Sequence, residues 1–414
     1  MRKRRRVVIT GVGAITSLGQ EKKELWSALC EGKSGIKPIT SFDTTAFDVH
    51  FGGEVSDFEP TRWLDTKEAR RLDRFAQFAL IASILAVEDA ELRFEGFDKT
   101  RGGVIIGSGM GGLLELEAQH EILLKKGPSR ISPFLIPKLM VNAAPAQVAI
   151  RFGLKGPNYA LVTACTTGGN AIGEAVRTIQ REDADIMVAG SSEAVVTPLT
   201  LGGFSSMKAL STRNDAPQKA SRPFDKDRDG FVLSEGAGVV VLEEFEFARK
   251  RGARIYAEVL GYGLNSDAYH IAAPEPHGEG AKRCMISALK DAQCNPEEVG
   301  YINAHATSTP IGDNIEMKAV KEVFGVHAPK IPISSTKSML GHQLGASGSV
   351  EVIICALAIT ESVMPPTINY ETPDPECMGL DFIPLVAREK KVKIALSNSF
   401  GFGGHNACII LGQV

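Results

Sequence analysis

Short apolar runs alternate with longer segments of helical periodicity along this sequence, and that alternation limits the folds it can adopt. The runs typical of buried strands are Val7–Thr10, Val104–Gly107, Tyr159–Val162, Ile186–Ala189, Val239–Leu242, Ile255–Leu260, Tyr301–Asn303, Ile331–Ser334 and Ile394–Leu396. The segments with helical spacing are Phe75–Val87, Asn142–Phe152, Gly168–Arg181, Gly280–Ala292, Gly312–Phe324 and Gly345–Thr360. Because such strands need both faces covered, the pattern predicts a layered α/β protein with largely parallel sheets.

The two halves of the chain carry weakly similar patterns. A strand followed by a glycine turn at Val7–Gly13 resembles Glu258–Gly263, and the strand, turn and helix around Cys165 resemble Ile331–Thr360. We therefore predict two related halves, residues 1–253 and 254–414, with Cys165 and His342 at corresponding turns.

Charge and hydrophobicity exclude several classes of partner. The chain has 46 basic and 49 acidic residues and is 43% hydrophobic, which is typical of a globular protein and gives no bulk attraction to nucleic acid or to a membrane surface. We find no apolar stretch of the ~18–20 residues that a membrane helix needs.

The cysteines and the start of the chain bear on its compartment. Seven cysteines without a C-x-x-C pair indicate neither a disulfide framework nor a zinc site, so a reducing, cytoplasmic compartment is expected. The basic start, residues 1–6, followed by an apolar run is superficially like a signal peptide. Glycines interrupt the run and no cleavage site follows, so a first core strand is expected instead.

Cys165 is the candidate nucleophile. It follows the apolar run Tyr159–Val162 and precedes the helical pattern from Gly168, so its sulfur is predicted to lie at a helix N-terminus. Free N–H groups and the helix dipole favour a thiolate there, and we expect the pKa of the Cys165 thiol to be lowered.

Three other turns that follow predicted strands carry polar side chains beside small residues. They are Asn303–Thr309 with His305, Thr336–His342 with Lys337, and Asn398–Asn406. Open α/β sheets build sites at the carboxyl ends of their strands, so these turns and the Cys165 turn are expected to meet in one pocket.

Other chemistries are excluded by spacing. Asp225–Gly230 opens like a calcium loop, but its closing acidic residue, Glu235, comes one position early, and we expect no metal. Neither glycine-rich segment, residues 11–13 or 107–112, fits a dinucleotide-binding motif, and the G-x-S-x-G elbow of serine hydrolases is absent from the sequence.

These motifs together resemble the β-ketoacyl-acyl-carrier-protein synthases, and most closely the synthase II condensing enzymes of fatty-acid elongation. The resemblance covers nearly the whole chain and rests on Thr163-Ala164-Cys165, Arg222–Asp225 with Asp229–Phe231, Gly236–Gly238, Asn303–Thr309, Lys337-Ser338 with Gly341-His342, and Asn398–Gly404. It implies a thiolase-like fold, with duplicated halves in a five-layered αβαβα sandwich, and a homodimer. It also implies condensation of an acyl thioester with malonyl-acyl carrier protein, with release of CO2.

The resemblance also implies roles for individual residues. Cys165 would carry the acyl chain, His305 and His342 would promote malonyl decarboxylation, and Lys337 would set the electrostatic state of the two histidines. The main-chain N–H groups of Cys165 and Phe402 would form the oxyanion hole, and Phe402 would be the gate of the site. Two neutral imidazoles can donate hydrogen bonds to an enolate oxygen without a metal.

Further positions would bind substrate or the carrier protein. The substrate-binding positions are Thr307 and Thr309, which would bind the phosphopantetheine arm, Met110 at the wall of the acyl pocket, and Phe400; Glu351 would be a supporting buried acid. The basic positions that would meet acyl carrier protein are Lys67, Arg70, Arg71 and Lys208. No cofactor is expected beyond the phosphopantetheine of the carrier protein, and the expected compartment is the cytoplasm, or an organelle stroma or matrix after transit-peptide removal.

Alternatives and departures remain. Polyketide ketosynthases share the Cys-His-His pattern, so that activity is the alternative enzyme; a chain-length-factor type of subunit is non-catalytic and normally lacks the cysteine. Ala272 and His405 stand where the family commonly has threonine, which leaves one expected pantetheine contact open.

Overall fold

The computed structural model describes residues 4–414 of the protein, and most of the strands in this range belong to one ten-stranded sheet. The strands are β1 (Val7–Ile15), β2 (Lys37–Pro38), β3 (Phe51–Gly52), β4 (Gly102–Gly107), β5 (Asn158–Tyr159), β6 (Ile186–Glu193), β7 (Gly236–Glu244), β8 (Ala257–Ser266), β9 (Tyr301–Asn303), β10 (Ile333–Ser334), β11 (Val363–Met364), β12 (Arg388–Glu389), β13 (Ile394–Gly401) and β14 (His405–Gly412). The ten-stranded order is β10-β9-β13-β14-β8-β1-β7-β6-β4-β5.

The strand order repeats between the two halves of the chain. In the first half, β7 pairs with β1 on one side and with β6 on the other. In the second half, β14 pairs in the same way with β8 and with β13, and all four pairs are antiparallel. The outer pairs, β6–β4–β5 and β13–β9–β10, are parallel. The halves join through the short β1–β8 pairing at Val8 and Ile9. This is the duplicated α/β arrangement that the resemblance implies.

The prediction of largely parallel sheets is wrong, because the central strands run antiparallel. All residues of β1, β6 and β4 are buried. An apolar run in the sequence indicates that both faces of a strand are buried, but it does not determine the direction of the strand. The expected strand Tyr159–Val162 is also displaced: β5 ends at Tyr159, and the chain from there to Thr163 is irregular.

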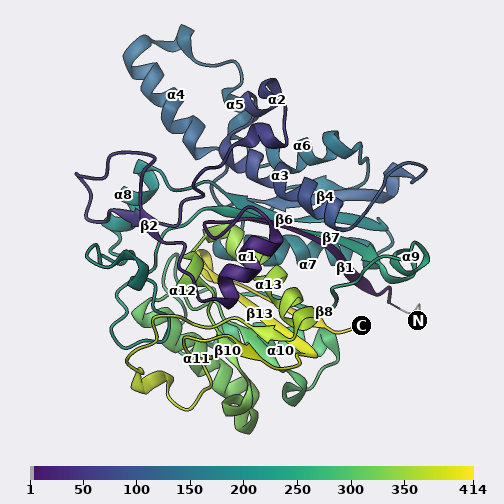
Figure 1. The fold of residues 1–414 in the computed structure, drawn as a ribbon, viewed down its shortest axis with the longest axis vertical. Helices are drawn as coiled ribbons and strands as arrows, with labels where there is room; N and C mark the ends of the chain where they lie inside the picture. The colour runs from purple at the N-terminus through teal and green to yellow at the C-terminus, as the bar shows by residue number, and fades with distance from the viewer. Residues whose placement is uncertain (1–3) are drawn as a thin grey trace.

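The helices are α1 (Lys22–Cys30), α2 (Thr66–Arg70), α3 (Arg74–Asp89), α4 (Leu113–Lys126), α5 (Leu135–Leu139), α6 (Ala143–Phe152), α7 (Thr167–Gln180), α8 (Pro198–Ser206), α9 (Phe245–Lys250), α10 (Glu279–Ala292), α11 (Pro310–Phe324), α12 (Lys337–Leu340) and α13 (Ser347–Glu361). In Figure 1, α3 and α6 cover the strands of the first half, α10 and α11 cover those of the second, and α7 and α13 lie between. The fold therefore has five layers, in which helices and strands alternate and α7 and α13 form the middle layer.

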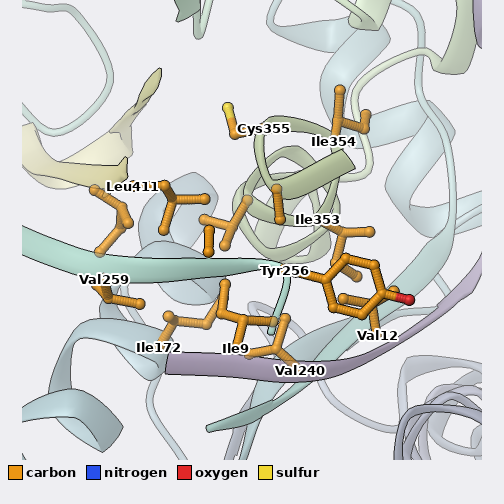
Figure 2. Packing of buried hydrophobic residues seen from close by; sticks show 14 of the residues in the cluster. Ile9, Val12, Ile172, Val240, Tyr256, Val259, Ile353, Ile354, Cys355 and Leu411 are labelled. Carbon is orange, nitrogen blue, oxygen red and sulfur yellow. The ribbon is translucent and has the colours of Figure 1, made fainter. Parts of the chain in front are cut away.

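The middle layer holds the central core. Figure 2 shows Ile353 of α13 and Ile172 of α7 packed with Ile9, Val240 and Leu411 from strands of both halves. Residues 344–361 form an apolar helical stretch of membrane-spanning length, contrary to our expectation from the sequence, but 89% of it is buried inside the protein. This stretch is therefore a core helix of the middle layer.

Glycines let one outer helix approach each half. A Cβ at Gly13 of β1 would lie 2.1 Å from the Ala82 carbonyl oxygen of α3, and one at Gly263 of β8 would lie 2.3 Å from the Cys284 carbonyl oxygen of α10. Only glycine permits such contact with a helix backbone. The glycine turns expected from the sequence are wrong, since Gly13 and Gly263 lie within the continuous strands β1 and β8. The resemblance between the two segments reflects the same strand–helix packing in both halves.

Candidate active site

Cys165 lies on a strained turn directly before the middle-layer helix α7. The turn is the short 3-10 helix Ala164–Thr166, and Ala164 adopts a left-handed backbone with φ of 51°. The corresponding turn before α13 is Leu344–Ala346, and Leu344 has φ of 46°. A strained backbone of this kind persists only where the surrounding structure holds it in place, and such residues are common at functional sites. The two turns bring Cys165 and the segment after His342 together.

His342 contacts the sulfur directly. Its Nε2 lies 3.0 Å from Cys165 Sγ, and its Nδ1 lies 3.0 Å from Ser347 Oγ. Ser347 Oγ accepts a hydrogen bond from the main-chain N–H of Gln343 at 3.0 Å. Ser347 therefore fixes the ring orientation of His342 from the first turn of α13.

His305 completes a compact group with the other two side chains. It follows β9, and its ring meets that of His342 edge to face with centroids 5.4 Å apart. The carboxylate of Glu316 in α11 accepts the main-chain N–H groups of His305 at 2.9 Å and Ala306 at 2.7 Å. Asn398 donates to the same carboxylate at 3.0 Å, so three segments are tied together beneath the histidine.

A buried ion pair sets the charge of the site. Lys337 and Glu351 are each 2% exposed and form a salt bridge. Burial and the Lys337 ammonium lower the pKa of His305 and of His342 well below the ordinary value, and His342 further lowers that of His305. Both imidazoles are therefore neutral at neutral pH, so each ring has one nitrogen that donates.

The expected lowering of the cysteine pKa is wrong for this resting structure. Burial raises the pKa of the Cys165 thiol to about 11, although Lys337 and the main-chain N–H groups of Phe402 and Cys165 act in the opposite direction. The Cys165 residue is only 8% exposed. The helix N-terminus is present, but desolvation of the charged form outweighs it.

A cavity of about 490 Å³ opens onto these three side chains. The predicted residues that line it with Cys165, His305 and His342 are Met110, Thr307, Thr309, Phe400 and Phe402. Ala272 lines it as well, so the missing threonine hydroxyl would have faced this space. The Phe402 ring lies 6.4 Å from that of Phe204, and glycines with positive φ follow at 403 and 404.

The other predicted residues lie outside the cavity lining. Lys67 and Arg70 on α2, Arg71 after it, and Lys208 after α8 are all exposed. Lys208 adjoins Met207, which lines the cavity. Cys165, His305 and His342 also form the one group of His, Cys and acidic side chains in residues 4–414 compact enough for a metal ion, with ligand atoms within 4.8 Å of one another.

Sequence reasoning missed Glu316, Ser347 and Glu193. Glu193 is a fully buried carboxylate at the end of β6 that lines the cavity. Its signal in the sequence was an acidic residue at the carboxyl end of an apolar strand. Glu316 lies inside α11 and Ser347 begins α13, and no local pattern distinguishes either of them from a surface polar residue.

Comparisons with known proteins agree with this geometry. The family described as "Beta-ketoacyl synthase, N-terminal domain" matches residues 4–248, and "Beta-ketoacyl synthase, C-terminal domain" matches residues 256–371. A "3-oxoacyl-[acyl-carrier-protein] synthase 2" of Coxiella burnetii is 52% identical over 99% of this chain and 99% of its own. One of the same name from Synechocystis sp. is 54% identical over 98% of this chain and 97% of its own.

A solved structure shares the complete fold. It is described as a type II PKS acyl-carrier protein in complex with its ketosynthase bound to the hexaketide, and it aligns with a TM-score of 0.91 and 37% identity over 100% of both chains. Two family matches that together span most of the chain, and relatives above 50% identity over nearly all of it, fix the assignment. The chain therefore belongs to the β-ketoacyl synthase family and is a condensing acyltransferase of the thiolase-like fold.

Proposed function

We propose that the protein extends acyl chains by condensing an acyl thioester with malonyl-acyl carrier protein, giving β-ketoacyl-acyl carrier protein and CO2 in fatty-acid elongation. The observation that carries this proposal is the meeting of Cys165, His305 and His342 at one end of a cavity with largely apolar walls. A nucleophile, two neutral hydrogen-bond donors and an apolar chain site are what this reaction requires.

In the first step, Cys165 takes the acyl chain from its carrier. The sulfur attacks the thioester carbonyl, the bond to the pantetheine sulfur breaks, and the thiol proton passes to that leaving sulfur. The developing oxyanion is held by the main-chain N–H groups of Cys165 and Phe402, which already lie against the sulfur. The Nε2 of His342, 3.0 Å from Sγ, stabilises the sulfur as it gives up its proton.

In the second step, malonyl-acyl carrier protein loses CO2 and forms an enolate. Neutral His305 and His342 donate to the enolate oxygen, and burial together with the Lys337 ammonium keeps both rings unprotonated. The enolate carbon then attacks the acyl carbonyl on Cys165. The C–S bond breaks, the new C–C bond forms, and the sulfur takes up one proton from solvent to restore the thiol.

The carrier protein is the proposed macromolecular partner. Thr307 and Thr309, whose hydroxyls lie 3.3 Å apart, line the cavity and would hydrogen-bond the phosphopantetheine arm. Four exposed basic residues would attract the acidic carrier protein, namely Lys67, Arg70, Arg71 and Lys208. The enzyme itself would need no resident cofactor or metal.

A second copy of the chain is the proposed subunit partner. Helix α4 has no buried residue and extends from the body of the fold in Figure 1, and strand β5 ends the ten-stranded order with an open edge. Exposed apolar side chains gather there, including Leu124 at 73% and Ile136 at 59% exposure. A second copy would cover the apolar side chains of α4 and the open edge of β5. The proposed compartment of the protein is the cytoplasm.

The polyketide alternative has weaker support. A polyketide ketosynthase shares the fold at 37% identity, whereas the relatives of fatty-acid type are 52% and 54% identical. A non-catalytic subunit of chain-length-factor type is disfavoured by the presence of Cys165.

The test is an assay of the purified protein with acyl- and malonyl-acyl carrier proteins. We expect β-ketoacyl-acyl carrier protein and CO2 in equal amounts, with saturated primers used in preference to poly-β-keto primers. Absence of condensation with every saturated primer would contradict the proposal, and sedimentation of the same sample reports the dimer.

A further inference from the structure

Glu193 occupies a position that the reaction steps above do not use. It ends strand β6, its side chain is fully buried, and it receives hydrogen bonds from four donors. Oε1 accepts the Ser108 hydroxyl and the main-chain N–H of Met110 at 3.2 Å, and Oε2 accepts the N–H of Gly345 at 3.1 Å. The N–H of Gly109 is the fourth donor.

These donors come from two separate turns. One is the turn 108–111 after β4, where the Ser108 hydroxyl also accepts the N–H of Gly111 at 2.9 Å. The other is the turn before α13, in which Gly345 is the counterpart of Cys165. A single carboxylate therefore fixes the relative position of two turns that come from different halves of the chain.

The fit around this carboxylate is tight. A Cβ at Gly109 would lie 2.6 Å from Oε2 of Glu193, and one at Gly345 would lie 2.9 Å from the Gly109 nitrogen. Neither turn can shift far without breaking a buried hydrogen bond and leaving its donor unsatisfied, which is energetically costly. Met110 and Leu344, one on each turn, both line the cavity.

We propose that Glu193 is a positioning residue for acyl-chain selection, because it fixes the turns that place Met110 and Leu344 at the wall of the cavity. This inference rests on the proposed condensation and adds a determinant of its primer range. A long acyl chain must pass this wall and depends on where it lies, whereas a short chain ends before it. Glu193 therefore acts on long primers through the wall and does not touch the reacting atoms.

The substitution Glu193→Gln tests this role. Glutamine keeps the size of the side chain but replaces one acceptor oxygen with an NH2 group, which would face donors only. We expect kcat/KM for long saturated primers to fall about tenfold relative to short ones, mainly through KM, while decarboxylation of malonyl-acyl carrier protein changes less than about threefold. Ser108→Ala removes one of the four donors and should shift the same ratio by about threefold.

The matched control is Glu243→Gln. Glu243 is equally buried, on β7, but accepts from Thr10 and Arg251 and does not line the cavity. It should lower the melting temperature without changing the ratio of long to short primers. The proposal is wrong if Glu193→Gln keeps the wild-type ratio of kcat/KM for long and short primers. It is also wrong if kcat/KM falls equally for all primers and the melting temperature falls with it. If Glu193→Gln does not fold, an unchanged ratio in Ser108→Ala overturns it.

These outcomes are separate from the test of the condensation itself. Wild-type protein that condenses no primer would contradict the proposed function, whereas wild-type activity with an unchanged profile in the variants would contradict only the role of Glu193.

Discussion

The Nε2 of His342 lies 3.0 Å from the sulfur of Cys165, although 177 positions separate the two residues in the chain. The contact exists because the turns before α7 and α13 occupy equivalent places in the two halves and meet in the middle layer. Duplication therefore creates the candidate site: one half supplies Cys165, the proposed nucleophile, and the other supplies the imidazole beside it.

The raised pKa of Cys165 predicts an unusual pH dependence for its reactivity. Because the thiol has a pKa of about 11, its thiolate fraction should increase about tenfold for each pH unit from about pH 7 to about pH 10. We expect the rate of alkylation by iodoacetamide, followed at the Cys165 peptide by mass spectrometry, to increase accordingly. A rate that reaches its plateau below about pH 8 would mean that the helix N-terminus outweighs burial.

The two histidines should separate the half-reactions. Replacement of His305 or His342 by alanine removes a donor to the enolate, so CO2 release should fall by about a hundredfold or more, while acyl transfer to Cys165 remains measurable. The measurement is CO2 release from malonyl-acyl carrier protein beside the intact mass of the acylated protein. Normal decarboxylation by either variant would refute the assigned role.

Lys337 should control the acid limit of decarboxylation. The folded pKa values of both histidines lie below the ordinary value, so the neutral rings persist as pH falls through that value. In the double variant Lys337→Met with Glu351→Gln, which removes the buried pair together, both pKa values should rise and the acid limb of CO2 release should move to higher pH. An acid limb that stays in place would show that burial alone sets them.

Met110 should limit the length of the acyl chain. Met110→Trp adds bulk at the cavity wall, and overfilling costs roughly 1–3 kcal/mol, so long primers should lose about tenfold to a hundredfold in kcat/KM while short primers lose little. The measurement is kcat/KM for saturated primers of graded length. Equal losses for all primers would indicate that the pocket ends elsewhere.

Local sequence patterns predicted the parts of the site that depend on local structure. The small-residue turn at Cys165 and the helix after it are found as expected, and the layered α/β class is correct. Strand direction was not predictable, since the buried runs of β1, β6 and β4 are apolar in either orientation.

The tertiary environment accounts for the remaining differences. The pKa of Cys165 depends on its burial by segments that are far away in the sequence. One of these segments contains Phe402, whose main-chain N–H points to the sulfur. Glu193 acquires its role only when the turns at Ser108 and Gly345 meet around it. No pattern within a short window carries such information.

The central claim is that Cys165 carries the acyl chain, and intact mass spectrometry tests it most directly. After incubation of the wild-type protein with acyl-acyl carrier protein, we expect one acyl group per chain, located on the Cys165 peptide. The variant Cys165→Ala should show no adduct, whereas Cys294→Ala, a matched change at a half-buried cysteine away from the cavity, should retain it. An adduct of unchanged stoichiometry in Cys165→Ala would contradict the account.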